Sequence, residues 1–399
     1  MNIYLLTLLL ITYYFSLNAQ SLTSFRGDNG KYGFKDINGK EIISPKYDYT
    51  FSGSDGISTV ELNRKRGFID STGKEIIPPI YDMATDFREG LAHVKINGKW
   101  GFINKTGKEV ISFNYDYASF FSEGLAEVQL NGKSGFIDKT GKEIIPFKYE
   151  QVWSFDDGLA AVKFDGKWGL IDKMGCEIVQ PKYDEIDIFE FPKSVGLDGK
   201  YGFIDKAGKE IIQLKYESAG RFEDGLVSVK LNGKWGIIDE SGKTITPFKY
   251  DHTDFESPQV EKFSEGLLRV AVGEIEFDGF YYGGKWGYIN KNGKEVVPLK
   301  YDAVDLFSEG LARVFLDEKY GLVNKEGKVV IPVKYDRIGD FQDGLAIVVL
   351  SGKYGFVNKT GKIIIPIKYD YVEPFNEGRA YVELGDKTFY INKTGKEVK

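Results

Sequence analysis

The residues best suited to acid–base or metal chemistry are scarce in this 399-residue chain, which has two histidines and one cysteine. His93 and His252 lie far apart, and neither lies near Cys176, whereas zinc sites combine several such ligands. A Ser-His-Asp triad would need one of the two histidines, and neither lies near a nucleophile-elbow sequence. The pattern therefore favours surface imidazoles, and it predicts no catalytic residue, no metal and no other cofactor.

Carboxylates are plentiful, and they recur at two fixed positions. Rows of carboxylates could bind calcium, which prefers several oxygen ligands. The acids come singly, however, so turn formation or pairing with nearby lysines is the simpler explanation. One set follows a tyrosine in a K-Y-D element, and the other precedes a glycine in F-x-[ED]-G: Asp48, Asp82, Asp116, Asp184, Asp251, Asp302, Asp336 and Asp370, and Glu89, Glu123, Asp157, Asp224, Glu265, Glu309, Asp343 and Glu377.

Aromatic residues offer a third chemistry, since the chain has 29 Phe and 25 Tyr. Exposed rows of rings could stack on sugars or recruit a partner protein, whereas buried rows would form a core in which the hydroxyls find local partners. The K-Y-D tyrosine occupies its position in all ten copies of that element. Because an unvarying position in a repeat is first of all a packing position, the core interpretation is favoured.

These positions belong to one unit that recurs about every 34 residues, from Ser21 to Lys399. A fixed period of this size indicates a repeat architecture, and such a chain is more suited to binding than to housing one catalytic cleft. An eleventh copy has Phe389 in place of the unit's first glycine. That glycine is Gly33, Gly67, Gly101, Gly135, Gly169, Gly202, Gly236, Gly287, Gly321 and Gly355.

One unit predicts about three short antiparallel strands and no helix. Leu91–Ile96 alternates apolar and polar residues, Asn97-Gly98 is a two-residue hairpin turn, and Lys99–Asn104 is the return strand. A turn that ends at Gly107 leads into the third strand. The glycine after Trp100 is expected to permit close approach of the adjacent unit's backbone or of an aromatic ring. One such meander cannot bury its own apolar face, so neighbouring units must stack.

The repeated hexapeptide resembles the signature of the WG-repeat family of bacterial β-repeat proteins. Arg66, Ser134 and Thr388 depart from the signature at the Trp position. The resemblance covers essentially all of the chain after residue 20, and it implies a repeat protein of the cell envelope with no shared catalytic residues. Intact copies are KWGFIN at Lys99–Asn104, KWGLID at Lys167–Asp172, KWGIID at Lys234–Asp239 and KWGYIN at Lys285–Asn290.

The expected fold is therefore an all-β tandem array of about eleven three-stranded units in an open, superhelical stack. The alternative is a closed ring like a β-propeller. Propellers have about 4 to 8 blades of four strands, so eleven three-stranded units have too many blades and too few strands.

The N-terminus predicts export. An apolar stretch from Tyr4 to Leu17 precedes a cleavage site after Ala19, which makes residues 1–19 a signal peptide and residues 20–399 the repeat domain. The stretch is shorter than the roughly 20 residues that span a bilayer, so no transmembrane segment is expected after cleavage. The protein would reach the periplasm, the outer surface or the medium. The net charge of −6, without a basic stripe, excludes a nucleic-acid partner.

The period breaks once, between Gly236 and Gly287, through an insertion within residues 252–284. Insertions in repeat arrays map to surface loops, often on the binding face. This insertion lengthens a hairpin, and it places Phe277, Phe280, Tyr281 and Tyr282 near the hairpin tip, while Trp153 is a further candidate contact outside the motif. We expect an exported, non-enzymatic scaffold for an envelope or extracellular protein or peptide. The alternatives are a carbohydrate-binding adhesion module and, less favoured, a hydrolase.

Overall fold

The computed structural model describes the backbone of residues 22–51, 53, 56–189, 191–253, 263–277 and 280–398, without the side chains of residues 274–282. The predicted signal peptide, residues 1–19, lies outside this part of the chain. The described residues form eleven small antiparallel sheets and no helix, so none of them forms a helix that could cross a membrane. The chain divides into two compact units, Met1–Ile188 and Phe189–Lys399.

In every sheet, strands that are consecutive in sequence are neighbours. The first unit contains β1 (Thr23–Arg26), β2 (Tyr32–Lys35), β3 (Glu41–Tyr47), β4 (Tyr49–Phe51), β5 (Ile57–Leu62), β6 (Lys65–Asp70), β7 (Glu75–Tyr81), β8 (Met83–Ala84), β9 (Leu91–Ile96), β10 (Lys99–Asn104), β11 (Glu109–Tyr115), β12 (Tyr117–Ser122), β13 (Leu125–Leu130), β14 (Lys133–Asp138), β15 (Glu143–Tyr149), β16 (Gln151–Val152), β17 (Leu159–Phe164), β18 (Lys167–Asp172), β19 (Glu177–Tyr183) and β20 (Glu185–Ile186).

The second unit repeats the same pattern. It contains β21 (Lys193–Leu197), β22 (Lys200–Ile204), β23 (Glu210–Tyr216), β24 (Ser218–Ala219), β25 (Leu226–Leu231), β26 (Lys234–Asp239), β27 (His252–Thr253), β28 (Leu267–Phe277), β29 (Phe280–Asn290), β30 (Glu295–Tyr301), β31 (Ala303–Val304), β32 (Leu311–Leu316), β33 (Lys319–Asn324), β34 (Val329–Tyr335), β35 (Arg337–Ile338), β36 (Leu345–Leu350), β37 (Lys353–Asn358), β38 (Ile363–Tyr369), β39 (Tyr371–Val372), β40 (Arg379–Leu384), β41 (Lys387–Asn392) and β42 (Glu397–Val398).

Most sheets contain the three predicted strands and a fourth. The added strand follows the K-Y-D element and lies at the edge of the sheet, as β8 does in the order β8-β9-β10-β11, and it is short except for the six residues of β12. In β24-β25-β26 the third predicted strand is wrong, because only isolated bridges such as Trp235–Tyr250 form there. Only β1-β2-β3 and β24-β25-β26 have three strands among the described residues. The hairpin between β9 and β10 has the predicted turn, with φ of 51° at Asn97 and 82° at Gly98.

The repeated first glycine permits close approach within its own sheet, not approach of the adjacent unit. The pairing of β10 with β11 shifts register between Trp100 and Phe102, which brings the backbone of β11 towards Gly101. A Cβ atom on Gly101 would lie 2.7 Å from Ile111 O and 2.8 Å from the Phe113 ring. The predicted approach of an aromatic ring is thus found at this glycine, and any larger residue here would collide with the facing strand.

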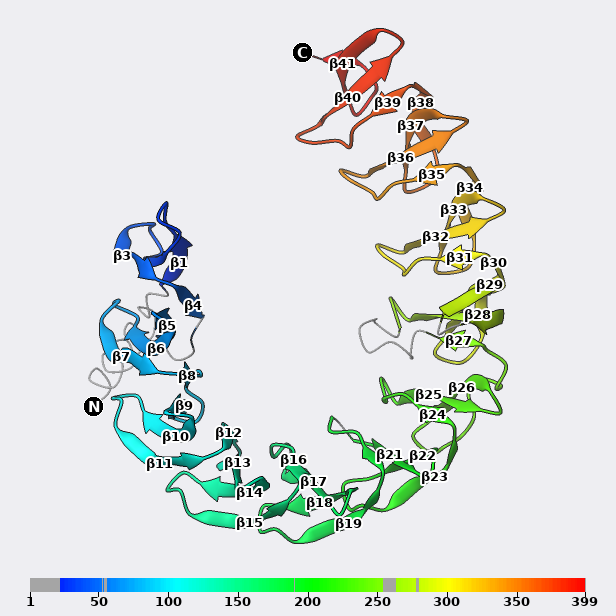
Figure 1. The fold of residues 1–399 in the computed structure, drawn as a ribbon. Coiled ribbons are helices and arrows are strands. Elements are labelled where there is room, and N and C mark those ends of the chain that lie inside the picture. Colours follow the sequence, from blue (N-terminus) through cyan, green and yellow to red (C-terminus); the bar gives the residue numbers. More distant parts are fainter. Residues whose placement is uncertain are drawn as a thin grey trace, which may run out of the picture. The chain divides into compact units, whose positions relative to one another are not determined.

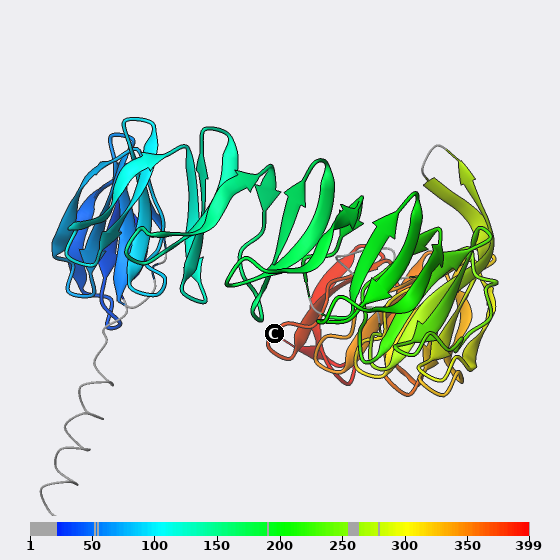
Figure 2. The same cartoon turned by 90° about the horizontal axis from the view of Figure 1, so that it is seen from below.

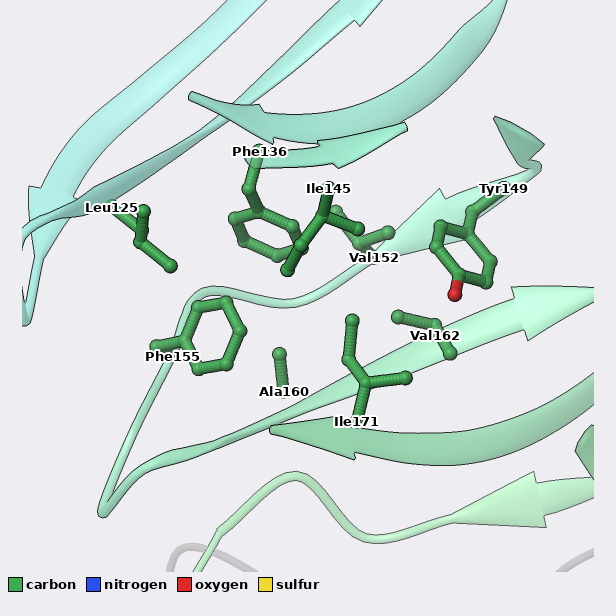
Figure 3. Packing of buried hydrophobic residues seen from close by; sticks show 9 residues of the cluster. All are labelled: Leu125, Phe136, Ile145, Tyr149, Val152, Phe155, Ala160, Val162 and Ile171. Carbon is green, nitrogen blue, oxygen red and sulfur yellow. The ribbon is translucent and has the colours of Figure 1, made fainter. Parts of the chain in front are cut away.

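The core of the protein lies between consecutive sheets. In the cluster of Figure 3, Phe136 and Ile145 from one sheet meet Val162 and Ile171 from the next, and all four are fully buried. Phe155, which follows the short strand β16, packs on Phe136 with ring centroids 4.8 Å apart. The same aromatic pair recurs at other interfaces: Phe68–Phe87, Phe102–Phe121, Phe203–Phe222, Tyr288–Phe307 and Phe356–Phe375, at 4.8–5.0 Å.

Within each unit, successive sheets therefore form one layer after another (Figures 1 and 2). Within each unit, taken by itself, the first and last sheets lie at opposite ends of the run (Figure 1). The all-β tandem array is confirmed. The K-Y-D tyrosines are part of this core, since nine of the ten are at most 5% exposed: Tyr47, Tyr81, Tyr149, Tyr183, Tyr216, Tyr250, Tyr301, Tyr335 and Tyr369.

Candidate functional site

The insertion lengthens one hairpin. β28 and β29 have 11 residues each, whereas the equivalent strands β32 and β33 have six. The extra rungs pair Ile275 with Tyr282, Glu276 with Tyr281, and Phe277 with Phe280. The side chains of Phe277, Phe280, Tyr281 and Tyr282 lie outside the described residues, as does the other inserted piece around residues 256–262. Their role in binding remains a prediction.

Trp153 directly follows the short edge strand β16, and its side chain is 48% exposed. The Trp153 N–H donates to Ala161 O at 2.9 Å, which fixes the backbone against the neighbouring strand. The ring is thus presented at the surface by an ordered backbone. Its predicted role as a contact site stays a prediction.

The acid of the K-Y-D element links two consecutive sheets. Asp302 accepts hydrogen bonds from Lys285 Nζ at 2.5 Å and from the Asp317 N–H, in the hairpin turn of the next sheet, at 2.9 Å. The hydrogen bond from Lys285 is the main reason why the pKa of Asp302 lies below its usual range. The same lysine pairing recurs in Lys31–Asp48, Lys65–Asp82, Lys99–Asp116, Lys167–Asp184, Lys234–Asp251, Lys319–Asp336 and Lys353–Asp370.

The acid of the F-x-[ED]-G element makes a second kind of link between consecutive sheets. Glu123 accepts a hydrogen bond from the Gly158 N–H of the next sheet at 3.1 Å, and it pairs with Lys173 of that sheet at 2.7 Å. Lys173 lowers the pKa of Glu123 below its usual range. Equivalent ion pairs are Glu89–Lys139, Asp224–Lys291, Glu265–Lys325, Glu309–Lys359 and Asp343–Lys393.

Both rows of carboxylates therefore hold neighbouring sheets together. Across the described residues, no group of three or more His, Cys, Asp or Glu side chains is placed to hold a metal ion. Turn formation and lysine pairing were the simpler explanation for these acids, and the structure contains both. What the sequence does not reveal is that the turns and lysines belong partly to the following sheet.

One histidine is not at the surface. His93 is 8% exposed, shares a 2.9 Å hydrogen bond with Thr85 Oγ1, and packs beside the Trp100 ring. Burial, with a smaller contribution from Arg88, lowers the pKa of His93 to about 4. The expectation of a surface imidazole is wrong here because His93, third in β9, faces the next sheet. Glu127, third in β13, is half-buried, and burial raises its pKa to about 7.

Exposed residues that differ between sheets lie on the edge strands. The first residue of these strands is Tyr49, Met83 and Tyr117 in three consecutive sheets, with exposed fractions of 58%, 43% and 45%. In the second unit the same position holds Tyr371, at 42%. The sequence pattern does not reveal this row, although every member directly follows the K-Y-D element. Two of its strands, β8 and β39, have only two residues and so show no periodicity.

A surface hollow adjoins this row in the first two sheets. It has a volume of about 780 Å³, and Arg26, Asn29, Asp48 and Arg64 contribute to its polar lining. Tyr49 also lines the hollow, where it stacks on Tyr32 with ring centroids 6.4 Å apart and planes inclined by 28°. The arrangement combines a flat aromatic face with several hydrogen-bonding groups.

Solved structures that resemble this chain do so only weakly. A crystal structure of a eukaryotic initiation factor has 11% identity over 78% of this chain and 94% of that one, with a TM-score of 0.37. PorZ, a surface component of the type-IX secretion system of Porphyromonas gingivalis, has 10% identity over 94% and 63%, with a TM-score of 0.24. The extracellular domain of a putative one-component system of B. thetaiotaomicron has 10% identity over 93% and 68%, with a TM-score of 0.21. Likenesses of this size carry no functional argument.

Family membership is established by sequence instead. No curated protein matches the chain. The model of the WG containing repeat matches ten consecutive segments: residues 32–65, 67–100, 100–133, 135–168, 168–190, 201–235, 235–274, 286–320, 320–354 and 354–387. These segments cover most of the chain. They are offset from the sheets, since segment 67–100, for example, holds the last two strands of one sheet and the first two of the next. The chain therefore belongs to the WG-repeat family.

Proposed function

We propose that this protein is an exported, non-enzymatic scaffold that binds an envelope or extracellular protein or peptide of a bacterium. The observation that carries the proposal is the row of exposed, mostly apolar residues on the edge strands, Tyr49, Met83 and Tyr117. The repeated acids and tyrosines are occupied in holding sheets together. The edge row is exposed, and Tyr49 and Tyr117 each also contact an aromatic ring of the preceding sheet.

The chemistry of this row suits a protein surface. Aromatic and methionine side chains provide large contact areas at interfaces, and Met adapts to irregular partners. The short strands that carry them are edge strands, whose outward backbone groups can pair with an extended segment of a partner. A peptide or loop that runs along the edge could therefore contact several sheets at once.

Crosslinking in the producing cells tests the proposal. A variant with Tyr49→Ser, Met83→Ser and Tyr117→Ser is compared with a control that carries Ile37→Ser and Met174→Ser, two turn residues with exposed fractions of 70% and 78%. We expect a specific protein to be captured by the wild type and the control, and not by the edge variant. Equal capture by all three proteins would contradict the proposal.

Export is tested separately, by sequencing the N-terminus of the protein recovered outside the cytoplasm. Cleavage after Ala19 predicts Gln20 as the first residue. A protein that stays in the cytoplasm and begins at Met1 would contradict export, without deciding whether the edge row binds a partner.

Carbohydrate binding is the second candidate, and the hollow beside Tyr32 and Tyr49 favours it. Sugar rings stack on aromatic faces while their hydroxyls bond to groups such as Asn29 and Asp48. Binding to envelope polysaccharide that is lost in Tyr49→Ala and kept in Met83→Ser would support this candidate over a protein partner. A hydrolase is the third, and turnover on a broad panel of glycan and ester substrates would overturn the non-enzymatic proposal.

A further inference from the structure

Arginine side chains close the gap between consecutive sheets at several places along the edge. Arg66, Arg269 and Arg313 each donate from Nη1 to a carbonyl of the next sheet's short strand, at 3.3, 3.1 and 3.1 Å. The acceptors are the carbonyls of Ala84, Val304 and Ile338, the second residues of β8, β31 and β35. The arginine is thus a recurring filler of this gap.

At Arg313 the guanidinium is also neutralised. Asp305, the residue after β31, accepts from Arg313 Nε at 2.6 Å, and Asp340 lies 3.2 Å from Nη1. The backbone holds this pair in place, because the Asp305 N–H donates to Arg313 O at 3.0 Å. The gap is therefore filled by a pair of residues: an arginine in the second strand of the sheet, here β32, and an acid that directly follows the short strand, here β31.

The next sheet, β35–β38, lacks both members of the pair. Ile347 is third in β36, as Arg313 is in β32, and Gly339 follows β35, as Asp305 follows β31. The backbone is equivalent, since the Gly339 N–H donates to Ile347 O at 2.9 Å. The result is a cavity of about 370 Å³ in place of the arginine–aspartate pair.

Most residues that line the cavity are apolar, while Arg313, Arg337, Asp340 and Gln342 are charged or polar. Ile347, Val349, Tyr354 and Phe356 come from one sheet, and Val372 and Phe375 come from the next. A small number of polar groups around an apolar pocket of this volume is typical of ligand sites. A partner's arginine would reach Val372 O, but it would lack the acid that Asp305 supplies to Arg313, so its charge would be buried without a partner. An apolar side chain is the better occupant.

The rim adds a charge preference. Arg337 lines the cavity mouth, its side chain is exposed, and it makes no ion pair within the described part of the chain. Asp340, the acid at this rim, is already paired with Arg313. Arg337 is therefore the cation at this rim that is available to bind an anion, through charge-assisted hydrogen bonds.

We propose that this cavity binds the C-terminal residue of a partner polypeptide, with its apolar side chain inside and its carboxylate on Arg337. The edge strands β35 and β39 flank the cavity and leave room for the preceding backbone to run along the edge. This inference rests on the proposed function as a peptide- or protein-binding scaffold, and it adds a specific site and ligand chemistry.

The test uses two fluorescein-labelled pentapeptides that end in phenylalanine, one with a free carboxylate and one amidated. Their binding to the full chain is measured by fluorescence anisotropy. The double variant Gly339→Asp with Ile347→Arg installs the pair found in the preceding sheet, so it fills the cavity with a combination that the fold already accommodates. Arg337→Gln removes the rim charge, and Arg64→Gln, an exposed arginine of the first unit, is its control.

We expect the cavity-filling double variant to weaken binding by at least about tenfold, which corresponds to loss of one buried apolar side chain. We expect the free carboxylate to bind about two- to fivefold more tightly than the amide, as for an exposed ion pair. This ratio should fall to about one in Arg337→Gln and persist in Arg64→Gln. Circular dichroism and thermal unfolding check that each variant is folded.

Undiminished binding to the double variant, equal affinity of the two peptides for the wild type, or no binding of either peptide would each overturn the site. The crosslinking experiment separates this failure from failure of the proposed function. Partner capture that persists without peptide binding would overturn the cavity alone. Peptide binding without any dependence of capture on the edge row would overturn the scaffold proposal instead.

Discussion

His93 and Glu127 make opposite contributions to the pH dependence of stability in the first unit. Both are third residues of their strands and face the next sheet, but one is a base and the other an acid. In the wild type the two contributions to the change of stability with pH largely cancel. We predict that His93→Gln or Glu127→Gln alone will make the stability of this region depend on pH.

The sign follows from linkage between proton binding and folding. The pKa of His93 falls from 6.5 to about 4 on folding, so its stabilising contribution is complete above pH 6.5 and is lost as pH falls towards 4. The pKa of Glu127 rises from 4.5 to about 7, so its contribution is complete below pH 4.5 and is lost as pH rises towards 7. Each pKa changes by about 2.5 (6.5 to 4, and 4.5 to 7), which corresponds to roughly 3 kcal/mol at about 1.36 kcal/mol per pKa unit.

Between pH 4.5 and 6.5 the two slopes are opposite and similar in size. The wild type should therefore change little over this range on account of these two residues. In Glu127→Gln only the pH dependence that His93 contributes remains, so local stability should rise by about 3 kcal/mol from pH 4 to 6.5. In His93→Gln only the pH dependence that Glu127 contributes remains, so local stability should fall by about 3 kcal/mol from pH 4.5 to 7.

Hydrogen–deuterium exchange of peptides that contain β9 and β13 measures this local stability, after correction for the pH dependence of intrinsic exchange. A local measurement is needed because repeat arrays can open in parts. The assigned burial of these groups would be refuted if local stability depended on pH in both variants as it does in the wild type, or if it changed with pH in the opposite direction. A control at Glu177, an exposed acid in the same unit, should leave the wild-type profile unchanged.

Three further substitutions test the packing and the links between sheets. Gly135→Ala should destabilise its sheet by about 1–3 kcal/mol in urea unfolding, since the new Cβ would lie 2.5 Å from a carbonyl of β15. Phe155→Ala should cost about 3–5 kcal/mol by the same measurement, and Phe164→Ala, at 39% exposure, clearly less. Glu123→Gln should cost about 0.2–1 kcal/mol, because its bond to Lys173 is largely at the surface, and high salt should diminish the difference in thermal unfolding.

Turn chemistry was the part of the fold that sequence predicted best. Positive φ restricts the choice of residue at a single position, so Asn97-Gly98 and the glycine of each tight turn are visible locally. The F-x-[ED]-G turn is an exception, since Glu123 itself has a φ of 52°. A glutamate gives no local sign of that conformation, and the turn is stabilised from outside, by Lys173 and the Gly158 N–H of the next sheet.

The features that sequence missed depend on neighbouring sheets. The two-residue strand β8 is too short to show alternation, and its pairing with β9 exists only in the folded sheet. The burial of His93 follows from the sheet that covers it, and nothing within β9 distinguishes that position from a solvent-facing one. The candidate contact residues of the lengthened hairpin could be located along the backbone, because the insertion breaks the period, but their side-chain environment could not.

The division between repeated and variable positions explains where this fold can acquire specificity. A K-Y-D tyrosine such as Tyr149 is 1% exposed and packs against the next sheet, so replacing it would disturb an interface. The residue two positions later starts the edge strand and can change at little cost, because exposed substitutions usually alter stability by no more than about 0.5 kcal/mol. In this chain that position holds Tyr, Met, Gln, Glu, Ser, His, Ala and Arg, while the buried tyrosine never varies. Stacking thus constrains the interior of every unit, and recognition of a partner is best sought at the edge strands and in the gaps that they border.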